Sequence, residues 1–83
     1  MLRAADRYDS DRPGLGDQFL DVIERAVDDI ASAPLRWRLV DGRHRRRVVK
    51  RFPYSIYYRL IESAVVIVAI AHHKRAPEYW RSR

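Results

Sequence analysis

The sequence predicts an α+β domain in which two N-terminal helices pack on a three- to four-stranded antiparallel sheet. In the first part of the chain, apolar residues recur at three- and four-residue steps, as they do on one side of a helix. In the second part, Val, Ile and Tyr dominate, and such residues favour strands. The turn signals between the predicted strands are short, which favours antiparallel pairing.

Length and charge set the first limits on function. A chain of 83 residues is one small domain, so we expect residues 1–83 to fold as a single unit. Residues 1–34 hold four basic and eight acidic side chains, whereas residues 35–83 hold thirteen basic and three acidic, which together give the net charge of +6. This basic second part indicates an anionic partner, such as a nucleic acid, a ribosome or an acidic protein segment. The alternative is a face that charge only keeps soluble.

Several classes of protein are disfavoured. The chain has no cysteine, which excludes a disulfide framework and a thiolate metal site. The longest apolar run, residues 64–71, is far shorter than the ~20 residues of a membrane span. No secretory signal opens the chain. We therefore expect a cytoplasmic protein with no membrane contact and no cofactor. His72 and His73 would point to opposite faces of a strand, so we expect no metal site.

Two helices are predicted ahead of the strands. Residues 1–10 carry a weak apolar stripe, and residues 17–32 carry a much clearer one. The members of the second stripe are Phe19, Leu20, Ile23, Val27 and Ile30. Pro13, Gly14 and Gly16 break the chain between the two helices, and Pro34 ends the second helix.

The strands follow. Residues 36–40 alternate and predict a short edge strand or an extended connector, and Asp41-Gly42 signals a turn. Strands are predicted at residues 43–52, 54–61 and 65–72, with a bend at Pro53 and a tight turn at residues 62–64. The nearly unbroken apolar run at residues 65–70 predicts that the last strand is central in the sheet. Residues 74–83 form a polar tail in which residues 77–80 could start a helical turn.

Three motifs lie along the chain in a characteristic order. They are Pro13-Gly14-Leu15-Gly16, then Arg51-Phe52-Pro53-Tyr54 followed by Ile56-Tyr57-Tyr58-Arg59, and finally His72 with Arg75, Pro77 and Trp80. In this order and spacing they resemble the RelE/ParE toxins of bacterial type II toxin–antitoxin modules, and the ParE-like members most closely. The fold of that family opens with a β-strand that this sequence lacks, so the resemblance implies an exposed sheet edge. It also implies that either the start codon lies upstream or the chain is a shortened copy of the toxin.

The resemblance also implies a function. It indicates a toxin that a cognate antitoxin neutralises in a toxin–antitoxin hetero-oligomer, with DNA gyrase as the target of ParE-like members. RelE-like members instead cleave mRNA on the ribosome, and this metal-independent endonuclease activity is the first alternative. A degenerate member that only binds an antitoxin is the second.

A ribonuclease that uses no metal needs a general base, cations that stabilise the phosphorane and a general acid. The candidates here are Arg47, Lys50, Arg51, Arg75 and Tyr79, with His72 or His73 as the base. Arg75 matches the C-terminal arginine of the family, and the family tyrosine falls at Tyr79 or Trp80. Ser55 stands where RelE-like enzymes carry a strand arginine after the bend. The set is therefore incomplete, and the gyrase interpretation is favoured.

The densest charge lies in residues 43–51, which hold six Lys or Arg in nine positions. Strand alternation places Arg45 and Arg47 on one face and Arg46 on the other, so some of these cations must lie at a rim. The predicted partner-binding residues are Arg45, Arg46, Arg47, Lys50, Arg51, Arg59, His72, Arg75 and Trp80. We interpret Tyr54, Tyr57 and Tyr58 as packing residues and not as platforms for bases. The same interpretation applies to Trp37 and Trp80.

Overall fold

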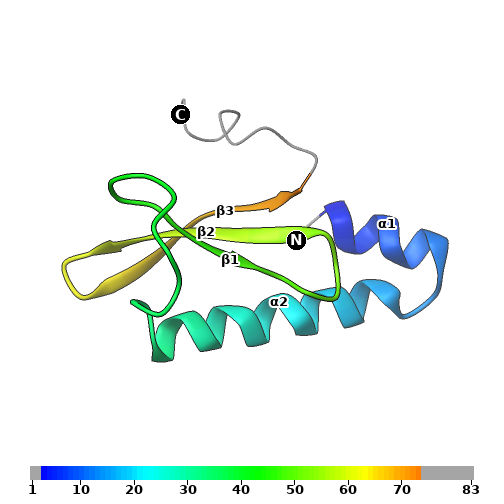
Figure 1. Ribbon diagram of the computed structural model, residues 1–83. Coiled ribbons are helices and arrows are strands. Elements are labelled where there is room, and N and C mark those ends of the chain that lie inside the picture. The colour runs from blue at the N-terminus through cyan, green and yellow to red at the C-terminus, as the bar shows by residue number, and fades with distance from the viewer. Residues whose placement is uncertain (1–2, 74–83) are drawn as a thin grey trace.

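The computed structural model describes residues 3–73, which form two helices followed by three strands (Figure 1). The elements are α1 (Arg3–Asp11), α2 (Leu15–Ser32), β1 (Arg45–Val48), β2 (Tyr54–Ile61) and β3 (Ala64–His72). Figure 1 shows α2 along one side of the sheet and α1 at the end of the sheet, packed against α2. Two helices followed by a three-stranded antiparallel sheet confirm the predicted α+β arrangement. The predicted tail at residues 74–83 and its turn at residues 77–80 lie outside the described residues.

The break between the helices depends on two glycines. Gly14 precedes α2 with φ at 86°, a left-handed conformation that glycine adopts without steric cost. Gly16 lies where α1 and α2 meet, and its N–H donates to Asp9 Oδ1 over 2.8 Å. A Cβ at Gly16 would lie 2.7 Å from Asp9 Cγ and even nearer the carbonyl oxygen of Ala5. The helices can approach this closely only because the residue has no side chain.

The sheet has the order β1-β2-β3, and both pairs are antiparallel. The prediction that the last strand is central is wrong: β2 is central, and β3 lies at an edge of the described sheet. Val66, Ile67 and Val68 of β3 are 39%, 36% and 37% exposed. The reason is topological, because β3 returns beside β2 through a short turn while β1 takes the other side of β2.

Strand β1 is shorter than predicted. The strand ends at Val48, and the N–H of Val49 makes one more hydrogen bond in the same register, to the carbonyl of Tyr54, which closes the bend around Pro53. The predicted turn at Asp41 is present, with the backbone N–H groups of Arg43 and His44 bonded to its carboxylate. An edge strand and an extended connector were the two alternatives predicted for residues 36–40. The structure shows the connector, in which only Leu39 makes a strand-like bridge, to Arg45.

The core lies between α2 and the central strand. Fully buried side chains on the helix and on β2 face each other, with further aromatic residues around them. These buried residues are Phe19, Ile23, Ala26, Ile30, Ile56 and Tyr58. The Phe19 ring lies 5.3 Å from Tyr8, 5.2 Å from Phe52 and 5.0 Å from Tyr54, measured between ring centroids. Through this one side chain α2 contacts α1, the bend and β2 together.

Replacing Gly16 by Ala should destabilise the fold by about 1–3 kcal/mol, because the added methyl forces α1 away from α2. The matched control is Gly42→Ala, since a Cβ at Gly42 would meet nothing within 4 Å and its φ is not left-handed. Urea unfolding followed by circular dichroism measures both variants. Equal midpoints for the two variants would contradict the close helix contact.

Candidate partner-binding surface

The arginines of β1 divide between the two faces of the sheet, as the alternation predicted. On the helix side, Arg47 donates to Asp29 Oδ2 of α2 over 2.8 Å. On the opposite side, Nε of Arg46 donates to the hydroxyl of Ser55 over 3.2 Å. Because β1 is an edge strand, both side chains also reach the rim of the sheet, where they line a hollow.

Trp37 also lines this hollow. The guanidinium carbons of Arg36 and Arg47 are 5.3 Å and 4.9 Å from the centroid of its ring, within the range of cation–π attraction. Arg45 donates to the Trp37 carbonyl over 2.6 Å and so fixes the connector to β1. The tryptophan is a half-buried packing residue, as predicted. Its contacts with two arginines were not predicted, although Arg-Trp-Arg ahead of a basic strand was a visible signal.

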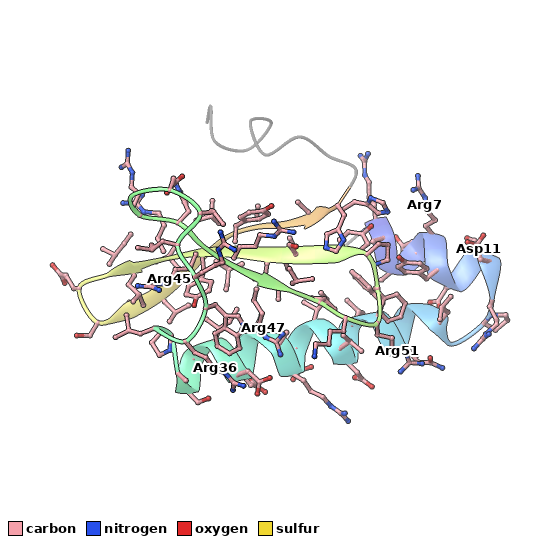
Figure 2. All side chains as sticks on the ribbon, viewed as in Figure 1. Arg7, Asp11, Arg36, Arg45, Arg47 and Arg51 are labelled. Carbon is pink, nitrogen blue, oxygen red and sulfur yellow. The ribbon has the colours of Figure 1, made fainter. Side chains whose placement is uncertain are left out.

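An open hollow of ≈ 580 Å³ surrounds these groups. Five cations and one carboxylate line it, together with one aromatic and one aliphatic side chain. The lining residues are Asp29, Arg36, Trp37, Arg38, Arg46, Arg47, Val48 and Lys50. We call this the basic hollow. Arg47 and Lys50 also line a neighbouring hollow of ≈ 340 Å³, together with Arg51. Figure 2 shows Arg36, Arg47 and Arg51 in a row along the α2 side of the sheet.

The structure brings together only some of the predicted site residues. Arg46, Arg47 and Lys50 line the basic hollow, and Arg51 lies next to it, where it donates to Gln18 of α2. Arg45 is directed to the connector instead.

Two other predicted residues lie away from the basic hollow. Arg59 is half-buried on β2, with an Nε that has no hydrogen-bond partner. The His72 ring lies 5.1 Å from that of Tyr54 in an edge-to-face contact. Arg75, Tyr79 and Trp80 lie outside the described residues.

The tyrosines of β2 pack in the core, as predicted. Tyr57 and Tyr58 are buried, and the Tyr58 hydroxyl donates to the carbonyl of Pro34 just beyond α2. Burial raises the pKa of the Tyr58 phenol, although nearby Arg45 acts in the opposite direction. Burial also raises the pKa of Tyr8, at the other end of the core. The two buried rings of β2 therefore present no open face on which a base could stack.

The connector ends in a turn held by one carboxylate. The backbone N–H groups of Arg43 and His44 donate to Asp41, and Nδ1 of His44 lies 2.9 Å from Asp41 Oδ2. The two backbone hydrogen bonds, and then the His44 ring, hold the pKa of the Asp41 carboxyl well below its usual range. The ionised form of Asp41 therefore stabilises the end of the connector that leads into β1.

Residues 3–73 contain no cluster of three or more His, Asp or Glu side chains placed to hold a metal ion. In the same stretch no helix has both the length and the apolar character that crossing a bilayer requires.

Comparison with known families gives one match. Residues 1–77 match the family described as "ParE toxin of type II toxin-antitoxin system, parDE". No curated protein and no solved structure matches the chain significantly. The match covers both helices, all three strands and the basic hollow.

The turn at Asp41 should resist acid. Since the pKa of this carboxyl is depressed in the folded state, its stabilising effect is complete above the ordinary value of 3.8 and is lost only as pH falls toward the lower folded pKa. An NMR titration should show the amide shifts of Arg43 and His44 still unchanged near pH 4. At lower pH, protonation of Asp41 should change these amide shifts, and in Asp41→Asn this change should be absent. A midpoint near 3.8 in the unsubstituted protein would contradict the assignment.

Proposed function

Because the chain belongs to the ParE toxin family of type II toxin–antitoxin systems, we propose that it arrests growth by binding DNA gyrase and not by catalysis of its own. Family membership implies a cognate antitoxin as its partner. Gyrase as the target, and the cytoplasm as the location where that target is found, are the further steps of this proposal. The observation that carries it is a surface of cations that the fold holds in place.

The fixed geometry of the arginines supports a binding role. Arg47 is held by Asp29 and by the ring of Trp37, and Arg51 is held by Gln18. A side chain that is already ordered loses little conformational entropy when a partner binds. Arginine also presents a planar fork of donors that suits carboxylates at protein interfaces. These features favour recognition of a protein surface.

Ser55 supports binding over RNA cleavage. It stands where RelE-like enzymes carry an arginine, and it is 1% exposed with its hydroxyl hydrogen-bonded to Arg46. Arg47, another candidate cation of a ribonuclease, is paired with the carboxylate of Asp29, which offsets its charge. A transition state that gathers negative charge needs cations aimed at it and not already neutralised. Arg75 and Tyr79 lie outside the described residues, so cleavage must be tested directly.

The composition of the basic hollow indicates which antitoxin segment would fit it. Its five cations outnumber the one carboxylate, Asp29, so the hollow calls for acidic side chains, while Val48 at 43% and nearby Leu39 at 47% exposure offer apolar contact. We propose that the antitoxin places an acidic segment with aliphatic anchors here. Single-stranded nucleic acid is a poorer fit, because it binds through open aromatic faces and Trp37 is engaged by two arginines.

Lys50→Glu should weaken antitoxin binding by at least about tenfold, because it reverses one charge in the hollow and repels an acidic segment. Isothermal titration calorimetry with the purified antitoxin, at two salt concentrations, measures the loss. The matched control is Arg7→Glu, which changes the net charge equally on exposed α1, away from the hollow (Figure 2). Similar losses for both variants would mean that net charge and not the hollow governs binding.

The gyrase proposal is tested with the purified 83-residue chain in two parallel assays. The first measures gyrase supercoiling of relaxed plasmid, and the second measures cleavage of a reporter mRNA on programmed ribosomes. We expect supercoiling to fall with toxin concentration, recovery on addition of antitoxin, and intact mRNA.

Each other outcome selects one of the alternatives. Ribosome-dependent cleavage that Arg75→Ala abolishes would replace the gyrase proposal with the endonuclease. Neither activity, with tight antitoxin binding retained, would leave a family member that only binds its antitoxin. The affinity for antitoxin is measured separately, so a wrong target would not count against the assignment of the basic hollow.

A further inference from the structure

Strand β3 presents an edge without the features that normally prevent pairing. Residues 64–71 contain no charged residue and no proline, and Val66, Ile67 and Val68 are all exposed. No strand among residues 3–73 pairs with β3 on the side away from β2. An uncharged edge of this kind is a template for another strand.

The opposite edge of the sheet is different. Strand β1 carries three consecutive arginines, and the connector covers part of it through the bridge between Leu39 and Arg45. The N–H of Arg46 is also used, since it donates to the carbonyl of Arg38. Charge and coverage both disfavour strand addition at β1. The described sheet therefore has a single open edge.

We propose that this edge pairs with the β3 edge of a second copy of the chain, in an antiparallel arrangement about a twofold axis. The β-bulge opposite Tyr57 and Tyr58 leaves Val68 without a partner on β2 and fixes the register. Val65 and Ile70 pack toward the helices, whereas Ala69 packs on the other face with Tyr57. When the twofold axis passes between Ile67 and Val68, residues that pair across the two β3 strands have their side chains on the same side of the joined sheet.

In this register Val65 faces Ile70 of the second copy, and Val66 faces Ala69. Both pairs are apolar, and the branched pair of Val65 and Ile70 in particular stabilises neighbouring strands. The ends of the pairing are complementary as well, because Glu62 in the hairpin turn faces His73 of the second copy. Both side chains are exposed, and the pair occurs twice by symmetry. This carboxylate–imidazole match favours a second copy over an acidic or nucleic partner for the same edge.

The pairing closes on itself. Within residues 3–73 each copy contributes one open edge, so the described strands form a six-stranded sheet with three strands from each copy. Its two outer edges are then the arginine-rich β1 strands, which disfavour further addition. A twofold contact of this kind gives a dimer and not a fibre.

The test compares two valine-to-lysine changes at exposed positions on opposite edges. Val68→Lys places a charge next to the proposed axis, whereas Val48→Lys places it on β1. In sedimentation equilibrium at concentrations on the order of 100 µM, the unsubstituted chain and Val48→Lys should be dimers. Val68→Lys should raise the dissociation constant by at least about tenfold. Far-ultraviolet circular dichroism shows whether each variant remains folded.

A charge exchange gives a second test that does not depend on Val68. Glu62→Lys alone and His73→Glu alone should each weaken the dimer, and the two combined should restore it. A monomeric unsubstituted chain, or equal weakening by Val48→Lys and Val68→Lys, would overturn the proposal. Amide exchange separates the reasons for a monomer: protected β3 amides would show that another segment of the same chain covers the edge.

Discussion

The packing of α2 against the central strand is the contact on which the rest of the molecule depends. Ser55, Ile56, Tyr57 and Tyr58 are consecutive in β2 and all buried, so the strand is covered on both faces. Ile56 and Tyr58 face the helix, whereas Tyr57 meets Val40 of the connector on the other side. A domain of this size buries only about 60% of its unfolded surface. Covering β2 on both faces therefore increases the area that the small core can bury.

This core also places the basic surface. The hydroxyl of Tyr58 holds the carbonyl of Pro34 where α2 ends, and Arg45 holds the carbonyl of Trp37 three residues later. These two hydrogen bonds direct the connector along the rim of β1, so that Trp37 lies under the guanidinium of Arg47. The positions of the cations that a partner would meet therefore depend on hydrogen bonds that Tyr58 and Arg45 make to the connector. Arg45 belongs to this support, which explains why it turns away from the hollow although its neighbours line it.

Local pattern was sufficient to predict the elements but not how they are arranged. The stripe through Phe19, Ile23 and Ile30 predicted α2, because helix periodicity reports directly on one buried side. The apolar run at residues 65–70 reported a preference for burial, yet it carried no information on which strands lie beside it. The hollow at Trp37 was missed for a related reason. It depends on one hydrogen bond between residues that are 24 positions apart and on another between residues that are 8 positions apart. No short motif records such contacts.

The two edges of the sheet divide recognition between them. The β1 edge is cationic and suits a partner of opposite charge, whereas the β3 edge is uncharged and suits an identical strand. Pairing at β3 would leave one basic hollow at each outer end of the joined sheet. A partner with two acidic segments could then occupy both hollows, and the second contact would form at the high effective concentration that the first one sets. Affinity would then exceed that of either hollow alone, so the neutral edge would strengthen binding at the charged one.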